Sequence, residues 1–470
     1  MTHNFDFIVI GGGSAGYAAA RTFCEDGGKV AVVDGGDELS GLCILRGCMP
    51  SKTLIYSAEV LHLAKQGQVF GFEKRSLQAE MAVMQKRKRN IISEFADYRT
   101  GQLQDGRFSL FRAKAKFTGE NSVELEDGTI LRANKFLIST GSKISMPPVP
   151  GLDRVSFKTS DDVLDLSEVP EEVIVLGGGI VACELAQFLS RVGARVTILQ
   201  RSNHILKEFP NAASTCIHKK FTEEGITVKT GVSIENLDQV DEETIRVNYF
   251  HDGEKNSHET KFLFHALGRS PAVDNLNLEG IGVELAKSGH IETNTFQQTS
   301  LLHIYAAGDC AGPHEIVHVA IRQGETAAMH ALGQKPEPLC YDHLLGVVFT
   351  DPQVASIGLL PEELDKRGIE YLSADYPFDD HGKSILMEAK HGYVAVHADK
   401  TTGVVLGAEC VGKDAGELIH TLSIAVSLKA TVHQLAKADW YHPTLSEIWT
   451  YPIEDLAELI SLQLKRNRKA

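Results

Sequence analysis

Residues 6–16 read DFIVIGGGSAG, an apolar run that passes directly into a glycine-rich turn. An alanine-rich stretch follows from Tyr17, and the next apolar run, residues 29–33, ends on an aspartate. This order of strand, GxGxxG turn, helix, strand and acid is typical of a Rossmann unit, whose turn and helix N-terminus receive a pyrophosphate and whose acid receives ribose hydroxyls. The stretch therefore predicts a dinucleotide site formed by Gly11, Gly13, Ser14, Ala15, Gly16 and Asp34.

The same pattern returns near the middle of the chain. Residues 173–176 predict a buried strand, residues 177–182 read GGGIVA with alanine in the third glycine position, and residues 195–199 predict the next strand. Two such units imply two dinucleotides, as in a flavin enzyme that is served by a nicotinamide. We expect the second one to contact Gly177, Gly179, Ile180, Val181 and Arg201, and Glu184 continues the helix that follows.

The end of this second unit carries no acid. Gln200 stands in that position and Arg201 follows it. An arginine here suits the 2′-phosphate of NADP, whereas a ribose-binding acid is typical of an NAD site. A solvated basic residue at the start of a loop would give the same pattern, so the choice between NAD and NADP stays open.

Composition and charge narrow the class of protein. The chain has 470 residues, enough for roughly three domains, and its 43% hydrophobic and 23% charged residues are ordinary for a globular protein. A net charge of −15 argues against a nucleic-acid partner. No apolar run approaches the ~20 residues that cross a bilayer, and the N-terminus lacks the cationic segment and cleavage site of a signal peptide. We therefore expect a cytoplasmic protein without a membrane partner.

Two of the eight cysteines, Cys43 and Cys48, lie close together in the stretch GLCILRGCMPSK, residues 41–52. Gly47 permits a bend between them, and Cys48 opens an expected helix whose N-terminal potential lowers a thiol pKa. A zinc site would need further ligands at matched spacing, and none are evident, so we expect no metal. Two independent buried cysteines are the other alternative, but beside two dinucleotide units a redox-active pair is favoured.

Three further apolar runs end in turns: FLISTG at 136–141, ALGRSP at 266–271 and IYAAGD at 304–309. Asp309, at the end of such a strand, could reach a ribityl hydroxyl, although an aspartate there is often only a helix cap. From about residue 341 alternating runs at 392–397 and 403–408 predict antiparallel strands, and helices are expected at 415–428 and 445–464.

Together these motifs resemble the class I pyridine nucleotide–disulfide oxidoreductases, the family of dihydrolipoamide dehydrogenase, glutathione reductase and mercuric reductase. GGGSAG, GLCILRGCMPSK, STGS, GGGIVACE, ALGRSP, AAGD and HPTLSE occur in family order along nearly the whole chain. The resemblance implies an α/β fold with two Rossmann-like domains, for FAD and NAD(P), and a C-terminal α+β dimerisation domain. The expected boundaries are 1–149 for FAD, 150–270 for NAD(P), 271–340 for a return to the central region and 341–470 for dimerisation.

The resemblance also implies roles for single residues. Cys43 would be the interchange thiol that meets the substrate, and Cys48 the charge-transfer thiolate over the flavin. Lys52 and Glu184 match family positions that pair near flavin N5. The remaining expected cofactor contacts are Asp34 on the adenosine ribose, Asp309 on the ribityl chain, His318 near the pyrimidine end, and Thr140, Gly141, Gly268 and Gly308 in the strand-end turns.

The stretch HPTLSE supplies the expected acid–base pair. A histidine titrating near neutrality can move the protons that dithiol chemistry requires, and Glu447 could fix the tautomer of His442. Thr444 and Glu447 also have the spacing of a helix capping box, which is the structural alternative for the glutamate. In the family this motif comes from the partner subunit, so the resemblance implies a homodimer with a shared active site.

The HPTLSE wording and the PSK after Cys48 resemble dihydrolipoamide dehydrogenase most closely, with a small dithiol or disulfide, or a lipoyl-bearing protein, as partner. An NADPH-dependent disulfide reductase of the glutathione reductase type stays open, as does a flavin-based redox sensor or assembly subunit with little turnover. Mercuric reductases and the larger thioredoxin reductases are disfavoured because no cysteine follows Cys410.

The redox stretch departs from the family pattern at two places. Ser40 precedes Gly41 where the family usually has a second glycine, and Arg46 puts a permanent cation between the cysteines. We hypothesise that Arg46 lowers a thiol pKa or favours an acidic disulfide. Ile180 also stands where many relatives carry an aromatic residue over the flavin.

Overall fold

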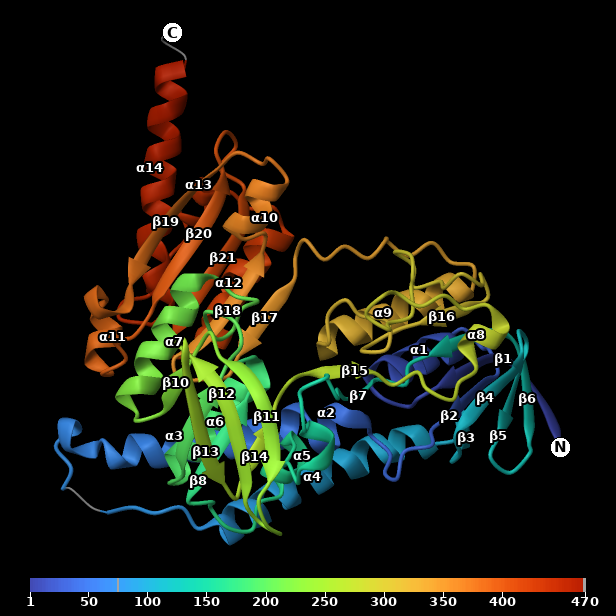
Figure 1. Ribbon diagram of the computed structural model, residues 1–470. Helices are drawn as coiled ribbons and strands as arrows, with labels where there is room; N and C mark the ends of the chain where they lie inside the picture. Colours follow the sequence, from blue (N-terminus) through green and yellow to red (C-terminus); the bar gives the residue numbers. More distant parts are fainter. Residues whose placement is uncertain (74–75, 468–470) are drawn as a thin grey trace.

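The computed structural model describes residues 1–73 and 76–467. Figure 1 shows the N-terminal segment and the yellow-to-gold segment side by side around one sheet. The orange and red C-terminal segment forms a second body that packs against the green segment. The first residues of the chain and the last described helix lie far apart in Figure 1. In the described part of the chain, no helix combines the length and the hydropathy needed to cross a bilayer.

The first sheet has seven strands in the order β3-β2-β1-β6-β5-β4, and β16 also pairs with β6. Strands β1, β2, β3, β6 and β16 run parallel, and their carboxyl ends meet at one edge. The early half of β6 pairs with β5 and its late half with β16, so a segment far along the chain completes the sheet. Its strands are β1 Thr2–Ile10, β2 Val30–Val33, β3 Ser109–Phe111, β4 Ala115–Gly119, β5 Ser122–Leu125, β6 Ile130–Ile138 and β16 Ile304–Ala306.

Helices α1 (Ser14–Glu25) and α9 (Val317–Ala331) pack against the parallel strands of this sheet. Helix α1 packs along α9, and a Cβ added to Gly324 would lie 2.2 Å from the Ala15 carbonyl oxygen. The other helices of this region are α2 Gly41–Arg46, α3 Cys48–Lys65, η1 Gly67–Phe70, α4 Met81–Gln104 and α8 Leu278–Ile281.

The second parallel sheet has the order β10-β9-β8-β14 and carries helices α6 (Ile180–Val192) and α7 (Asn211–Glu223). Its strands are β8 Glu172–Leu176, β9 Arg195–Leu199, β10 Thr227–Lys229 and β14 Leu263–His265, beside the antiparallel β11 Ser233–Gln239, β12 Ile245–His251 and β13 Glu254–Thr260. The short pair β7 Ser142–Ile144 and β15 Arg269–Pro271 links the two Rossmann units, with η2 Leu152–Arg154 and α5 Ser160–Leu164 between them.

The C-terminal body is an antiparallel sheet in the order β17-β18-β21-β20-β19, covered by α12 and α14. Trp449, Ile453 and Ile460 bury themselves against it. The expected single helix over 445–464 is divided, because a 3₁₀ turn precedes α14. The elements are β17 Leu345–Val348, β18 Gln353–Gly358, α10 Pro361–Lys366, β19 Tyr371–Pro377, η3 Phe378–Asp380, α11 Gly382–Leu386, β20 Tyr393–Asp399, β21 Val405–Gly412, α12 Ala415–Ser427, α13 Val432–Leu435, η4 Ser446–Trp449 and α14 Thr450–Asn467.

Glu409 is a buried carboxyl group in this C-terminal core. Burial raises the pKa of Glu409 to about 7, against a partial lowering by the Tyr393 hydroxyl. Because the folded-state pKa lies above the unfolded value, protonation of Glu409 stabilises the fold at low pH, and this contribution is lost as pH rises through about 7.

We expect Glu409→Gln to remove this pH dependence, because glutamine cannot ionise. The stability advantage of the variant over the wild type should grow by about 2–3 kcal/mol between pH 5 and pH 8.5. Denaturant melts at both pH values measure it, with the exposed Glu458→Gln as the control. An advantage that is the same at both pH values would contradict the buried, titrating carboxyl.

Candidate active site

The first glycine-rich turn is shaped by close backbone contacts. Gly11 has φ +103°, and a Cβ on it would lie 2.3 Å from the Ser139 carbonyl oxygen, while a Cβ on Gly16 would lie 1.9 Å from the Gly11 oxygen. Only glycine fits both positions. Above Gly13, in contrast, the nearest atom to an added Cβ is the Gly41 Cα at 4.0 Å. Helix α1 begins at Ser14, so its free N–H groups, those of Ser14 and Ala15 included, face this open loop and fit a pyrophosphate.

The expected ribose acid is tied into the same turn. The Asp34 carboxylate is largely buried and accepts hydrogen bonds from the N–H groups of Gly12 (2.8 Å) and Gly36 (3.0 Å). At the neighbouring strand end, the buried Oγ1 of Thr140 has no hydrogen-bond partner in the described part of the chain, and Gly141 has φ +72°. An orphaned hydroxyl beside an open glycine loop fits a polar cofactor that supplies the missing partner.

The second turn repeats this geometry. Gly177 has φ +105° and approaches the Ala266 carbonyl, whereas a Cβ on Gly179 would meet nothing within 4 Å. Helix α6 starts at Ile180, and both Ile180 and Val181 are exposed at 38% and 45%. Two exposed apolar side chains at a helix N-terminus fit the flat face of a nicotinamide or a flavin ring.

Arg201 is exposed just beyond β9. Across residues 1–73 and 76–467 it has no recorded ion pair or hydrogen bond. The side-chain amide of Gln200, at the position of the ribose-binding acid, donates a hydrogen bond to the His204 carbonyl at 3.4 Å. The guanidinium is therefore available to a phosphate.

Asp309 lies at the carboxyl end of β16 and accepts a hydrogen bond from the Ser142 hydroxyl at 2.6 Å. Ser142 in turn accepts one from Arg269 Nε at 2.8 Å, next to Gly268, whose φ is +103°. The Gly308 N–H donates to the fully buried Gln323 at 2.7 Å. Gln323, which the motifs did not single out, fixes this turn. His318 lies exposed in the first turn of α9.

The two cysteines face each other across a helix break. Cys43 lies in α2, Cys48 begins α3, and Gly47 stands between the helices. A Cβ on Gly47 would lie 3.0 Å from the Cys43 Cα, so a larger residue would push the helices apart. Both thiols are free and interact through a side-chain hydrogen bond.

This contact separates the acidities of the two thiols. The hydrogen bond from Cys43 lowers the pKa of Cys48, and burial opposes it by raising this pKa. The positive charge of Lys52 and the N–H of Cys48 lower it further, to about 7. The same hydrogen bond, together with burial, raises the pKa of Cys43. Near neutral pH the pair is therefore a Cys48 thiolate that accepts a hydrogen bond from a Cys43 thiol.

Lys52 is held by the second Rossmann unit. Its Nζ donates to Glu184 Oε2 at 2.7 Å, and the other Glu184 oxygen accepts the Phe349 N–H at 2.9 Å. Lys52 Nζ also lies 4.7 Å from the centre of the Phe349 ring. Phe349 carried no signal in the sequence, because its role depends on its backbone N–H.

Arg46 does not point at the thiols. Its guanidinium lies 3.8 Å from the Asp161 carboxylate, and the leading cation acting on Cys48 is Lys52. The structure thus gives no support to a thiol pKa set by Arg46, and leaves the acidic-disulfide hypothesis.

The conformation of Ser40 and a hydrogen bond of its hydroxyl account for serine at this position. Its φ is +108°, a left-handed conformation that suits the glycine found in relatives. The buried Ser40 hydroxyl donates to the Ala96 carbonyl of α4 at 3.0 Å, which compensates part of the backbone strain.

His442 and Glu447 form a contact in the C-terminal body. Nδ1 of His442 lies 3.0 Å from both carboxylate oxygens, so it donates to Glu447 and leaves Nε2 of an exposed ring free. The Thr444 hydroxyl accepts the Glu447 N–H at 3.3 Å, which is half of a capping box. The Glu447 carboxylate contacts His442 and does not return to the backbone N–H of Thr444, so the side chain has the geometry of a His–Glu pair.

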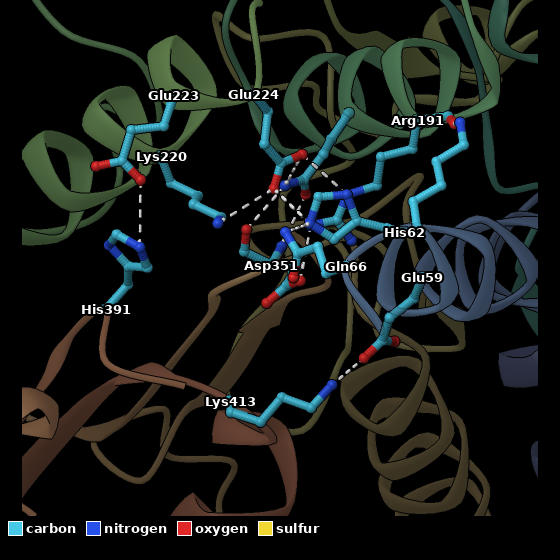
Figure 2. Close-up of polar contacts among 12 residues, drawn as sticks. Glu59, His62, Gln66, Arg191, Lys220, Glu223, Glu224, Asp351, His391 and Lys413 are labelled. Carbon is cyan, nitrogen blue, oxygen red and sulfur yellow. Dashed lines mark hydrogen bonds and ion pairs between the residues drawn. The ribbon is translucent and has the colours of Figure 1, made fainter. Parts of the chain in front are cut away.

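An ion-pair junction joins three parts of the chain on the side of the Lys52–Glu184 pair. Figure 2 shows the side chains of His62, Arg191, Glu224 and Asp351 converging, with Lys220 close by. Arg191 donates to Glu224 (2.7 and 2.9 Å) and to Asp351 (2.7 Å). Potential metal-ligand atoms of His62, Glu224 and Asp351 (one nitrogen and two carboxylate oxygens) lie within 4.8 Å of one another, a spacing suited to a metal ion. Arg191 and Lys220 already balance both carboxylates, so a cation would have to displace them, and we interpret the cluster as an ion-pair junction.

The fold contains two glycine-rich turns, each at the start of a helix, and a pair of neighbouring cysteines. Residues 5–324 match the family model described as pyridine nucleotide-disulphide oxidoreductase, and residues 345–452 match its dimerisation domain. The chain belongs to the pyridine nucleotide-disulphide oxidoreductase family.

Named relatives are of more than one kind. A mercuric reductase of Bacillus cereus is 33% identical over 95% of this chain and 70% of its own length. A dihydrolipoyl dehydrogenase of Chlamydia muridarum is 30% identical over 96% of each chain. The crystal structure of LpdA from Mycobacterium tuberculosis superposes with a TM-score of 0.86, at 26% identity, over 96% of this chain and 99% of its own.

These comparisons confirm the expected fold class, with two Rossmann-like domains followed by a dimerisation domain. They also confirm the cofactors, FAD and a nicotinamide nucleotide. The chain is a flavoprotein disulfide oxidoreductase by family, and the dimerisation domain supports a homodimer.

Proposed function

We propose that the chain oxidises a dithiol substrate in the manner of dihydrolipoamide dehydrogenase, with Cys43 and Cys48 as the relay. The observation that carries the proposal is the arrangement of the pair: Cys43 faces Cys48 across Gly47, and Cys48 begins α3 one turn before Lys52. This arrangement lowers the pKa of Cys48 and raises the pKa of Cys43. A stable thiolate next to the flavin and a thiol that needs a base are what the two assigned roles require.

Side chains of this protein carry out the proton transfers and the thiol–disulfide exchange. His442 removes a proton from a substrate thiol, which attacks the Cys43 sulfur and breaks the Cys43–Cys48 disulfide. Cys48 leaves as a thiolate, stabilised by Lys52 and the α3 N-terminus. The second substrate thiol then attacks the first substrate sulfur, closes the substrate disulfide and expels Cys43. Cys43 takes the proton held by His442, and the freed His442 accepts the proton of the second substrate thiol. FAD, when bound, accepts the electron pair and supplies hydride transfer to the nicotinamide.

The base is proposed to act across the dimer. His442 is 78% exposed, and its recorded hydrogen bonds within the described residues go to Glu447. Tyr441 beside it is also exposed, at 82%. A histidine presented this openly, in a domain whose family function is dimerisation, supports a site completed by the partner subunit.

An NADPH-dependent disulfide reductase is the second candidate, and Arg201 is the observation that favours it. An exposed arginine with no recorded partner in the described residues suits a 2′-phosphate. In that case the same relay would run in reverse, from nucleotide to disulfide.

Anaerobic titration of the purified holoprotein with NADH and, separately, NADPH tests both candidates. A long-wavelength absorbance from the Cys48 thiolate beside oxidised flavin is expected, and it should vanish as pH falls below about 7, where Cys48 becomes protonated. Bleaching of the flavin without this band would contradict the relay and leave the redox-sensor alternative.

Arg201→Ala separates the two nucleotides in the same titration. If Arg201 binds a 2′-phosphate, the variant should weaken NADPH about tenfold and leave NADH unchanged. Preference for NADH in both proteins would favour the dehydrogenase. Steady-state rates with dihydrolipoamide and with glutathione disulfide then name the substrate class, and negligible rates with both would favour a sensor.

A further inference from the structure

The Glu447 carboxylate lies between two imidazoles. On its exposed side His442 Nδ1 is 3.0 Å away, and on its buried side His381 Nε2 lies 3.5 Å from Oε1. His381 is fully buried between η3 and α11, and residues 381 and 447 meet only through the fold. Among the described residues His381 Nε2 forms no hydrogen bond, so the 3.5 Å ion-pair contact with Glu447 is the polar contact that this atom faces.

A hydroxyl on the far side of the ring fixes the tautomer of His381. Ser384, also fully buried, has its Oγ 2.8 Å from His381 Nδ1. Burial lowers the pKa of His381, partly offset by the charge of Glu447, so the ring is neutral and carries one proton. With that proton on Nδ1, the Nε2 lone pair would face a carboxylate. With it on Nε2, Ser384 donates to Nδ1 and the N–H faces Glu447, which is the favourable arrangement.

The groups around His381 leave Glu447 as its charged partner. Tyr451 meets the ring edge to face at 6.3 Å between centroids, and Tyr376 stacks on Tyr451 at 3.7 Å. The nearby carboxylate of Asp380 accepts the Tyr376 hydroxyl at 2.9 Å. The described polar and charged groups that act on the ring directly are Ser384, Glu447 and, through its charge, His442.

We propose that His381 is a positioning residue for the acid–base pair: its Nε2–H holds the Glu447 carboxylate against His442 and shares its negative charge. Two consequences follow from that geometry. The carboxylate is kept beside His442 Nδ1, and its negative charge is shared between the two imidazoles. The proposal rests on the proposed function, in which His442 is the base.

His381→Leu tests the proposal in the holoenzyme, because leucine fills the cavity but donates no hydrogen bond. We expect the acidic limb of the kcat/KM pH profile to move upward by about half a unit, since the whole carboxylate charge then acts on the imidazolium. We also expect a loss of kcat of about tenfold. Nicotinamide-driven flavin reduction, which needs no base, monitors the integrity of the fold.

His381→Gln is the matched variant that keeps an N–H donor, and it should restore most of the wild-type profile. Ser384→Ala releases the tautomer and should move the acidic limb in the same direction by a smaller amount, which keeps the proposal testable if the leucine variant does not fold. An unmoved acidic limb in both His381→Leu and Ser384→Ala, whatever the loss of rate, would overturn the proposal. If His442→Gln itself leaves turnover intact, the proposed function fails instead.

Discussion

Replacing Cys43 by serine should abolish turnover with dithiol and disulfide substrates, with a loss of about 10⁴-fold or more. The expected loss is large because Cys43 forms the bond to substrate in the proposed cycle, and a hydroxyl cannot form the mixed disulfide. The serine hydroxyl can still donate to the Cys48 thiolate, which also keeps the Lys52 charge and its own helix N–H. The long-wavelength absorbance should therefore survive in Cys43→Ser.

Cys48→Ser is the matched partner of that variant. It should lose both turnover and the long-wavelength band, because the thiolate beside the flavin is gone. Absorbance spectra of both variants across pH 5–9, with stopped-flow reduction by the preferred nucleotide, measure the difference. A band that survives in Cys48→Ser would contradict Cys48 as the charge-transfer thiolate. Turnover that survives in Cys43→Ser would contradict Cys43 as the thiol that meets the substrate.

The second large effect is expected from His442→Gln. Loss of a positioned base slows proton transfer by about 10²–10⁴-fold, so turnover should fall by that factor while nicotinamide-driven flavin reduction stays normal. Glu447→Gln should cost less, because His442 keeps its ring and loses only its orienting charge. His3→Gln, at an exposed histidine in β1, is the control. A loss in flavin reduction as large as the loss in turnover would point to damage of the fold instead.

Mixed dimers test whether His442 serves the partner subunit. Cys43→Ser and His442→Gln homodimers should each be inactive. Random reassociation should restore about a quarter of the wild-type activity, because about half of the dimers carry one intact site. No recovery after verified exchange of subunits would place the base in the same chain as the thiols.

Much of the nucleotide-binding fold follows from local pattern. The turns at Gly11 and Gly177 are dictated by backbone contacts that only glycine allows, so the motif and the geometry coincide. Expected strands such as 195–199 are found with the same bounds, since an apolar run between polar residues has one way to enter a parallel sheet. The pairing of Lys52 with Glu184 came from family resemblance, and the structure brings the two side chains together.

The sequence could not decide what depends on distant partners. The spacing of Thr444 and Glu447 fits a capping box and a catalytic dyad equally well, and only the direction of the carboxylate separates them. The position of Arg46 between the two cysteines suggested an effect on their pKa values, but in the structure its guanidinium pairs with Asp161, which is distant in sequence. The contact of His381 with Glu447 left no local signal at all.

Helix α3 connects two features that were described separately. Its first residue is Cys48, and its last turns carry His62 and Lys65 into the ion-pair junction, where Lys65 donates to the Arg191 carbonyl at 3.3 Å. Eighteen residues of helix form a rod of roughly 27 Å. The C-terminal end of that rod is anchored to the second Rossmann unit and, through Asp351, to the C-terminal region. The position of the Cys48 sulfur at the other end therefore depends on both. A tilt of either one would move the helix and displace the sulfur.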